Sequence, residues 1–543
     1  MKKVTALLLS VIMMVCLLAG CGSGSTTTTQ SGSKGGSADT QAGDTGTAKT
    51  DTADDAGADS AGTDQAGTAG TKGGDSGEPY TIAIEMLYFG MEDPDMQTVV
   101  DAINAITEPA INATVSFVPT SFGEMATKPG LWHSSGDKVD ILMTGMMTTP
   151  QQLAEQGLLY PLDELLAGSE TLTQLAGDLL SACRYKGVTY AYPLDLYPGN
   201  GQAFFYDEAL AETYNIQLPE SITTEADLES VLEQVKASGM SQYPMTYGDG
   251  VLAYQYYGYD MENFGDNYCS RGVIMNVDGN TTVENWYGSD TYKQMCQLHR
   301  DWYEKGYLVP DSLSNGYTYL DNMSQGTIFG FISSDGVSVG EAYYETQTGK
   351  KLGSIPMSEP VIRTSDVVVN TWGISSSCEN PEKVLEFMEL LYTNEELANL
   401  FNYGIEGQHY VKEENSRLIN YPEGVNAMSA GYGTSVTTGS FGDRSILYAW
   451  ADTWTEETLA DVGRFGAKEG EVSTWLGFNY DMSTMVTENA AVMAVIQKYA
   501  PSLACGVVDV DDTLPKFLDE LKKAGMGKIV EDTQKQVDAW LAQ

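Results

Sequence analysis

From Tyr80 onward, short apolar runs typical of strands alternate along the chain with apolar positions spaced as on one face of a helix. Residues 80–87 form an apolar run typical of a buried strand. Asp93 and Pro94 then open a helix, as an N-cap and a first-turn proline. The helix stripe is Met96, Val99, Val100, Ile103 and Ile106. Further strands are predicted at 113–118 and 139–143, with a helix at 150–156. Strands that alternate with helices predict an α/β structure with parallel pairing.

The second half of the chain shows longer helical stripes and one hairpin signal. Asn280 ends a turn-forming sequence that starts at Asn276, and residues 327–332 read as a buried strand. Helices are predicted at 206–216, at 225–238, from Ser289 to Gly306, from Asn380 through Tyr392, and twice in the C-terminal 30 residues. The alternation therefore continues through the chain.

The first 79 residues differ from the rest. Lys2 and Lys3 precede an apolar run, Val4 to Leu18, that is shorter than the ~20 residues of a membrane-spanning helix. Such a run indicates an export signal over residues 1–20. Residues Leu18 to Cys21 read Leu-Ala-Gly-Cys and resemble a bacterial lipobox, so we expect Cys21 to be acylated and the chain to be cut before it. We therefore expect the protein at the extracellular face of the membrane, with a lipid anchor at Cys21.

The segment from Gly22 to Glu78 contains no aromatic residue and no Leu, Ile, Val or Met. A chain with nothing to bury stays disordered. We therefore interpret residues 21–79 as the acylated cysteine and a flexible linker, with an r.m.s. span of roughly 40 Å.

The charge balance limits the possible partners. The chain carries 29 Lys and Arg against 75 Asp and Glu, a net charge of −46. The linker has nine acidic residues and three lysines, and the signal has two lysines, so −42 falls on residues 79–543. This argues against a nucleic-acid partner, because phosphate contacts need a basic face. Three His and no paired Cys motif leave little for a metal site, so we expect neither a metal nor a cofactor.

Several segments resemble family 1 extracellular solute-binding proteins. Residues 140–144 and 154–163 are similar to the first lobe of that family, and 204–210 to the entry into the second lobe. The same resemblance covers 302–307, 326–331, 370–374 and 402–410. The tail, 524–529 and 536–541, is similar to a C-terminal domain of unknown function found in Gram-positive lipoproteins of this family.

The resemblance implies an α/β protein with a two-lobed, periplasmic-binding-protein-like fold of type II, in which a hinge joins the lobes and a cleft holds the ligand. The implied boundaries are 80–195 and 335–378 for the first lobe, 196–334 and 379–470 for the second, and 471–543 for a helical region packed on the second lobe. The family implies a monomeric, non-catalytic receptor that delivers a solute to the permease of an ABC importer. The surplus of Tyr (32) over Phe (14) suggests a carbohydrate, because rings with a polar tip suit sugars.

Candidate ligand contacts come first from the turns that follow strands of the first lobe. A doubly wound sheet binds ligands at the carboxyl ends of its strands. The candidates there are Tyr88 and Phe89 after the first strand, and Met146 and Thr148 after the third.

The remaining candidates lie at the expected lobe crossings. Asp195 and Tyr197 stand in a proline-bounded segment that is typical of extended chain. By resemblance, Ser334 and Asp335 border a crossing, Trp372 borders the cleft, and Glu406 belongs to the Asn402–Tyr410 segment. An ordinary loop remains open for Asp195 and Tyr197, and a structural salt bridge for Glu406.

Two other functions stay open. A surface glycoside hydrolase needs two carboxylates at a defined separation, which 75 acidic residues could supply but no sequence can locate. A receptor for a cationic peptide would account for the strong negative charge, although that charge also serves solubility.

Overall fold

The computed structural model describes residues 77–88, 93–121, 123–145, 147–246, 261–265, 270–277, 279–314, 316–336, 341–426, 429–433, 441–451, 454–456, 459 and 471–542. The chain divides into two units, Met1–Glu78 and Pro79–Gln543, and the fold below belongs to the second. No helix among these described residues is long and apolar enough to cross a membrane.

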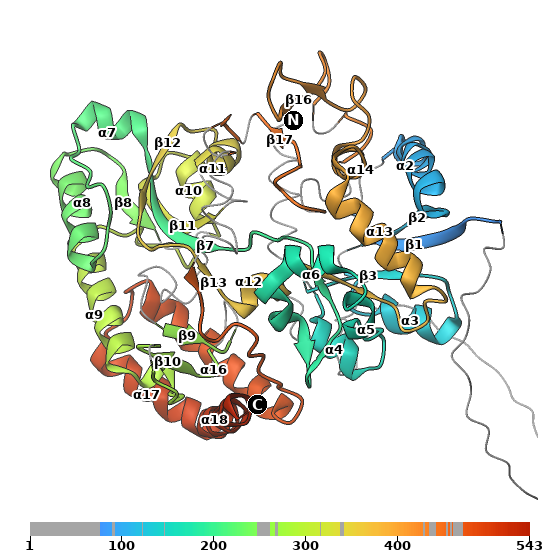
Figure 1. Ribbon diagram of the computed structural model, residues 1–543. Coiled ribbons are helices and arrows are strands. Elements are labelled where there is room, and N and C mark those ends of the chain that lie inside the picture. Colours follow the sequence, from blue (N-terminus) through green and yellow to red (C-terminus); the bar gives the residue numbers. More distant parts are fainter. Residues whose placement is uncertain are drawn as a thin grey trace, which may run out of the picture. The chain divides into compact units, whose positions relative to one another are not determined.

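The first sheet has five strands in the order β2-β1-β3-β14-β6 (Figure 1). Strand β1 runs parallel to both of its neighbours, while β14 runs antiparallel to β3 and β6. The predicted parallel pairing therefore holds for β1–β3, and the sheet as a whole is mixed. The strands are β1 (Tyr80–Tyr88), β2 (Ala113–Ser121), β3 (Ile141–Thr144), β14 (Thr371–Ile374) and β6 (Tyr192–Pro193).

Helices with apolar stripes pack on this sheet. The Val99, Val100 and Ile103 side chains of α2 (Met96–Ile111) join one buried cluster with Ile82 and Ile84 of β1. The cluster also takes in α13 (Pro381–Thr393) and α14 (Glu395–Tyr403). Smaller elements complete this half: α3 (Lys128–Ser135), α4 (Pro150–Glu155), α5 (Asp163–Leu166), α6 (Glu170–Ala176), η1 (Gly177–Cys183), β4 (Arg184–Tyr185) and β5 (Val188–Thr189).

Two predicted helix starts are wrong by a few residues. The N-cap of α2 is Asp95 rather than Asp93. The helix predicted at 206–216 begins at Glu208, because Tyr206 still pairs in the sheet and the Asp207 side chain accepts from Leu210 N. At α2 either of two Asp positions fits a cap, and at α7 the strand continues to the capping residue Asp207.

The second sheet contains six strands, ordered β18-β13-β7-β11-β8 with β12 also paired to β7. They are β7 (Asn200–Asp207), β8 (Tyr243–Thr246), β11 (Ile328–Gly336), β12 (Leu352–Pro356), β13 (Val361–Ile362) and β18 (Glu471–Val472). Phe204 and Phe329 of this sheet pack with Trp302 of α9 (Asp290–Lys305). The other helices are α7 (Glu208–Tyr214), α8 (Glu225–Ala237), α10 (Tyr319–Ser324), α11 (Glu341–Thr348) and α12 (Thr364–Val368).

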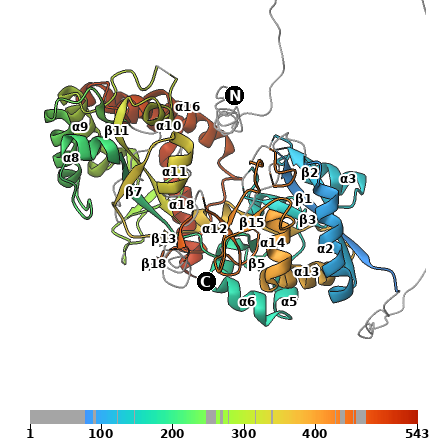
Figure 2. The ribbon, with the colours of Figure 1, turned by 90° about the horizontal axis from the view of Figure 1, so that it is seen from above.

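The packing corrects the predicted lobe boundaries. The sequence places residues 379–470 in the second lobe, but α13, most of α14 and several buried residues after them, as far as Leu459, belong to the buried cluster of the first sheet. It places residues 335–378 in the first lobe, but α11 and β12, which lie in this range, pack on the second sheet. Figure 2 shows the same grouping, with α13, α14 and α2 beside β1 and β3. The boundary error arose because the sequence shows where elements lie and not which sheet they cover.

The C-terminal helices pack against α9. Tyr292, Met295 and Cys296 of α9 share a buried cluster with α16 (Val486–Ala504), α17 (Val510–Ala524) and α18 (Met526–Leu541). Since Trp302 of the same helix packs on the second sheet, α9 connects the C-terminal helices to that sheet. Nearby lie η3 (Trp286–Gly288) and the antiparallel pair β9 (Met261–Asn263) and β10 (Val273–Met275).

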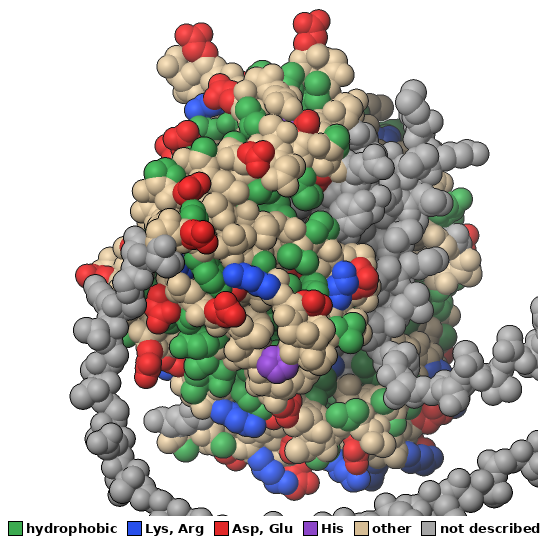
Figure 3. Space-filling model, turned by 90° about the vertical axis from the view of Figure 1, so that its right-hand side faces the viewer, with side chains coloured by type: hydrophobic (Ala, Val, Ile, Leu, Met, Phe, Trp, Pro, Cys, Tyr) green, Lys and Arg blue, Asp and Glu red, His purple; other side chains and the backbone are tan. Residues whose placement is uncertain are grey.

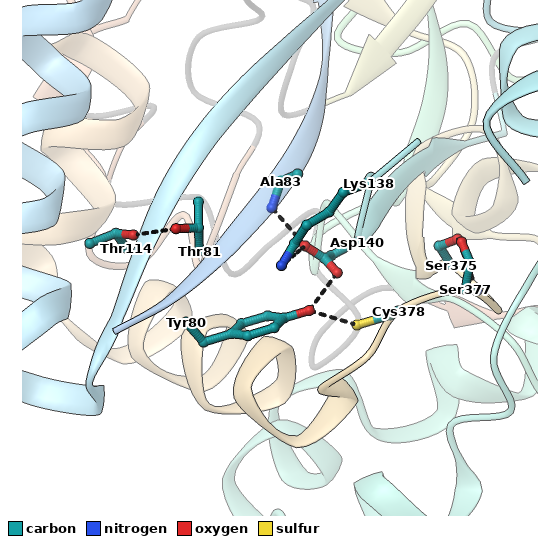
Figure 4. A network of polar contacts seen from close by, with 9 residues as sticks. All are labelled: Tyr80, Thr81, Ala83, Thr114, Lys138, Asp140, Ser375, Ser377 and Cys378. Carbon is teal, nitrogen blue, oxygen red and sulfur yellow. Dashed lines mark hydrogen bonds and ion pairs between the residues drawn. The ribbon is translucent and has the colours of Figure 1, made fainter. Parts of the chain in front are cut away.

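A polar network ties the first residue of β1 to its neighbours (Figure 4). The Tyr80 hydroxyl donates to Asp140 Oδ1 at 2.8 Å, and Asp140 Oδ2 accepts from Ala83 N at 2.8 Å. Lys138 Nζ lies 3.8 Å from the centroid of the Tyr80 ring. The chain that precedes Tyr80 therefore joins the sheet at the amino end of β1, opposite the carboxyl end at Tyr88.

Glu85 is the one fully buried acidic residue of β1, and its position predicts a pH effect. Its side chain is 0% exposed and Oε2 accepts from Met143 N at 3.1 Å. Burial raises the pKa of Glu85 to about 8 from 4.5, although hydrogen bonds from Met143 and Thr120 lower it. The folded protein therefore binds more protons than the unfolded chain between these two values, so stability falls as pH rises through that window.

We predict that Glu85→Gln removes this contribution. Between pH 5 and pH 8 the free energy of unfolding of the wild type should fall by up to about 4 kcal/mol more than that of Glu85→Gln. Urea denaturation at several pH values measures the difference. Glu164→Gln, at an exposed position, is the control for the loss of one carboxylate. Parallel pH profiles for the wild type and Glu85→Gln would contradict the prediction.

Candidate functional site

One edge of the first sheet gathers the ends of several strands. Because β1 and β3 are parallel, Tyr88 and Thr144 end at the same edge. The antiparallel register brings Thr371 beside Thr144 and Pro193 beside Thr371. The order β2-β1-β3 means that the connections from β1 and from β2 leave on opposite sides, which is the switch point where open α/β sheets bind ligands. This edge is therefore the candidate functional site.

The turn after β3 is closed tightly. Gly145 N donates to the Thr148 carbonyl at 2.8 Å, and Gly145 has φ +110°. A Cβ on Gly145 would lie 2.2 Å from the carbonyl oxygen of Val368, at the end of α12. Only glycine allows the two backbones to come this close. The segment before β14 therefore lies against the turn after β3, which also carries the half-buried Thr148. Met146 and Phe89 lie outside the described residues, as does the side chain of Tyr88.

The predicted residues Asp195 and Tyr197 do lie at this edge, directly after β6. Asp195 forms a two-point ion pair with Arg444, in which Nε donates to Oδ1 at 3.1 Å and a terminal amino group donates to Oδ2 at 2.9 Å. Both side chains are 14% exposed. The Tyr197 hydroxyl donates to Asp443 Oδ1 at 2.9 Å, and burial together with Asp443 raises the pKa of Tyr197 to about 12. Tyr197 therefore stays a neutral donor at physiological pH.

The loop that supplies Asp443 and Arg444, residues 441–448, is irregular but held from two sides. On α14, Asn402 accepts from Phe441 N at 3.1 Å and donates to its carbonyl at 2.7 Å. Asn399 accepts from Tyr448 N at 2.7 Å and donates to the Ile446 carbonyl at 2.9 Å. Both asparagines are almost fully buried, so these bonds form away from water and hold the backbone on each side of Arg444.

Arg417 holds the same loop from the other side. One terminal amino group of Arg417 donates to the carbonyls of Arg444, Ser445 and Leu447, at 3.0, 2.8 and 3.1 Å. Arg417 directly precedes β16 (Leu418–Asn420), which forms a small sheet with β15 (Val411–Lys412) and β17 (Ala449–Trp450). Sequence analysis missed Arg417, Asp443 and Arg444, because they follow no periodic pattern and their role depends on contacts across 27 to 249 positions.

The structure corrects the predicted role of Trp372. The prediction placed it in the cleft as a stacking surface, but it is 1% exposed. Its indole N–H donates to the Tyr392 hydroxyl at 3.2 Å, and its ring meets Phe441 edge to face at 5.7 Å. The Tyr392 hydroxyl in turn donates to the Pro193 carbonyl at 2.7 Å. Trp372 therefore supports the site from inside the core and presents no face to a ligand.

The prediction that Ser334 and Asp335 border a crossing between the lobes is also wrong. Their backbones pair with Gln202 and Gly201 inside the second sheet, and the chain continues to α11 and β12 in the same half. The crossing that the sequence placed there lies instead at β13–α12–β14. Glu406 is exposed on a turn and its backbone bridges Tyr410. That turn is held by His409, whose Nδ1 accepts from Ile405 N at 2.8 Å.

Two acidic side chains lie near the crossing at α12. Asp366 Oδ2 accepts from Arg363 N at 2.9 Å, and burial raises the pKa of Asp366 to about 7 while Arg363 lowers it. Glu262 of β9 accepts from the Ser473 hydroxyl at 2.7 Å, and burial raises its pKa as well. These acids share Arg363 as a nearby cation and join the second sheet, α12 and the start of the C-terminal region.

Comparisons with known proteins give the family. Residues 92–398, more than half of the chain, match the bacterial extracellular solute-binding protein family. The chain belongs to this family. Residues 474–542 match a domain of unknown function, DUF3502, which corresponds to the C-terminal helices. The resemblance seen in the sequence is therefore confirmed.

Solved structures support the fold. The N-glycan transport solute binding protein from Streptococcus pneumoniae has a TM-score of 0.72 at 23% identity, over 86% of this chain and 99% of that chain. An HMO-binding, ABC-transporter-associated solute-binding protein from Bifidobacterium longum infantis has a TM-score of 0.58 at 17% identity, over 86% of this chain and 99% of that chain. A curated relative from Streptococcus pneumoniae, a carbohydrate ABC transporter substrate-binding protein, is 25% identical over 87% of this chain and 93% of its own length. The predicted two-lobed α/β class is confirmed.

Because Trp372 is buried, we predict that its substitution lowers the stability of the fold, whereas the sequence alone predicts a role in ligand binding. Trp372→Ala should lower the free energy of unfolding by about 3–5 kcal/mol, because it removes a packed ring and leaves the Tyr392 hydroxyl with one partner fewer. Trp302→Ala, at a residue that is 0% exposed, should cost a similar amount. Chemical denaturation measures both, and Leu131→Ala at an exposed site gives the baseline. A stable Trp372→Ala protein with weakened ligand binding would restore the stacking interpretation.

Proposed function

We propose that this solute-binding protein is a lipid-anchored extracellular receptor that binds an oligosaccharide and delivers it to the permease of an ABC importer. The observation that carries the proposal is the edge of the first sheet, where Asp195, Arg444 and Tyr197 are held together beside the chain crossings. The similar proteins from Streptococcus pneumoniae and Bifidobacterium longum carry names that refer to glycans, HMO or carbohydrates.

The side chains at this edge suit sugar hydroxyls. A carboxylate accepts hydrogen bonds from hydroxyls, and a guanidinium donates to their oxygens, with charge assistance that makes each bond stronger. Because Asp195 and Arg444 are each 14% exposed, they are fixed by one another while part of their surface can be reached. A few such groups in fixed positions are what orients a ligand in a binding site.

We expect the two halves to close around the ligand by bending at the segments that join them. Between β6 and β7, and again between β13 and β14, short segments join the two sheets. The chain matches one structure of the Streptococcus pneumoniae protein with a TM-score of 0.72, and the complex of that protein with Man5GlcNAc with a TM-score of 0.60, at similar coverage. A rotation of two rigid halves about their joining segments would lower the TM-score over the whole chain, although it leaves each half unchanged.

No arrangement among the described residues favours a glycoside hydrolase. The carboxylates described at the edge already have partners: Asp195 pairs with Arg444, and Asp443 accepts a hydrogen bond from Tyr197. A cationic ligand has no specific support at this edge either, because its described carboxylates already have partners, and Figure 3 shows both acidic and basic side chains on one face of the molecule. We expect the receptor to act as a monomer and without catalysis.

A thermal-shift screen against glycans tests the proposal. Wild-type protein is heated with neutral oligosaccharides, among them Man5GlcNAc, and with basic peptides as a comparison. A ligand that binds only the native state at 100 times its Kd adds about 2.7 kcal/mol to stability and raises Tm by several degrees. Arg444→Ala should reduce the shift at equal glycan concentration, whereas Lys523→Ala, on the exposed side of α17, should not. A shift with peptides alone, or release of smaller sugars, would contradict the proposal.

The anchor is tested separately. We expect Cys21→Ala to release the protein into the medium, because no acyl chain can then be attached and one chain or none gives no stable membrane binding. Fractionation of cells followed by immunoblotting measures the distribution. Substitution of Ser23 by Ala, two positions away, should leave the protein in the membrane fraction. A Cys21→Ala protein that resists washing from the membrane would contradict the lipobox interpretation.

A further inference from the structure

The cation at the candidate site is already neutralised inside the protein. Arg444 uses Nε and one terminal amino group on the two oxygens of Asp195, and Asp443 stands next to it in the chain. The three side chains carry a net charge of −1. We infer that the site takes uncharged oligosaccharides and rejects those that carry uronic or sialic acid groups. This inference rests on the proposed function and names the ligand class of the same site.

Arg444 cannot easily be redirected toward an anionic sugar. The loop around it is fixed by Asn399 and Asn402 from α14 and by Arg417. If Arg444 turned to a ligand carboxylate, Asp195 would keep one backbone partner, Tyr197 N at 2.8 Å, and lose both guanidinium bonds. Because Asp195 is only 14% exposed, water would replace those bonds poorly, and the loss would offset much of the new contact.

Other cations near the crossings are also occupied. Arg363 lies beside Asp366 and Glu262, whose pKa values it lowers. Lys412 donates to the Tyr448 hydroxyl at 2.9 Å and lies near Glu406. Arg417 points at backbone carbonyls. Each of these contacts reduces what the cation could offer to a ligand carboxylate.

A ligand that brings its own negative charge to this edge would meet the net charge of −1 that Asp195, Arg444 and Asp443 carry together. At an effective dielectric constant near 20, one like charge several ångströms away weakens binding roughly ten-fold or more. Such repulsion against the wrong ligand is a common source of specificity.

The test compares neutral and acidic hexasaccharides of equal length at low salt. The neutral set contains manno-, malto- and cello-hexaose, and the acidic set contains hexamers of mannuronate and of galacturonate. Titration calorimetry with wild-type protein should give a Kd for the best neutral sugar at least ten-fold below that of any acidic one. Because surface charge is screened by salt, the ratio should shrink at high ionic strength.

Two variants locate the discrimination. Asp195→Asn removes the charge that neutralises Arg444, so the ratio of acidic to neutral Kd should fall by at least about three-fold. Glu531→Gln changes the net charge by the same amount on the exposed side of α18 and should leave the ratio unchanged. If Asp195→Asn melts below the assay temperature, Arg444→Gln replaces it, and acidic sugars should still be rejected.

The outcomes separate the inference from the proposed function. Wild-type protein that binds an acidic hexamer as tightly as a neutral one would overturn the inference and leave the carbohydrate receptor standing. So would an acidic sugar whose binding disappears in Arg444→Gln, because Arg444 would then be its recognition group. If no sugar of either set binds, the carbohydrate proposal itself fails.

Discussion

The contact between Asp195 and Arg444 connects the parts of the candidate site. Asp195 belongs to the segment that leaves the first sheet after β6, and Arg444 belongs to a loop 249 positions later in the chain. The pair is only slightly exposed, so its Coulomb attraction is partly cancelled by the loss of hydration. Its value is therefore geometric: two N–H···O bonds fix the direction from which the chain approaches the second sheet.

The loop around Arg444 shows why such a pair needs support. An irregular loop has unpaired backbone groups that must find partners when buried. Here Asn399 and Asn402 each act as donor and acceptor, and Arg417 covers three carbonyls. The buried ring of Trp372 and the hydroxyl of Tyr392 hold the opposite side, at Pro193. A ligand that meets this edge therefore meets groups whose positions are already set, and little ordering is left to occur on binding.

Two acidic side chains with raised pKa values, Asp366 of α12 and Glu262 of β9, lie away from the ends of the first-sheet strands. Burial raises the pKa of Asp366 to about 7, and it raises that of Glu262. Both lie where α12, β9 and the start of the C-terminal region meet. The C-terminal region also touches the first half, since Asn479 donates to the Ala182 carbonyl at 3.0 Å and Gly477 lies against Ser181. The domain of unknown function is thus fixed to α9 and lies in contact with both halves.

Local patterns in the sequence determined most of the elements. The stripe at Val99, Val100 and Ile103 predicts α2, and the Ser289 and Gly306 signals match the ends of α9, because caps and apolar periodicity act over a few residues. The family was also readable, since ordered segments from Asp140 to the tail carry it. The acylated cysteine and the ligand remain predictions that no part of the fold tests.

Only the tertiary structure decided which elements belong together and which side chains form the site. Trp372 read as a cleft residue because polar residues precede it, yet its ring faces the core between Tyr392 and Phe441. Asp195 and Tyr197 could be suspected from the proline-bounded segment, but their partners Arg444 and Asp443 could not. The physical reason is distance along the chain. A strand or helix reflects forces between near neighbours, whereas an ion pair between residues 249 positions apart depends on how whole sheets and helices pack.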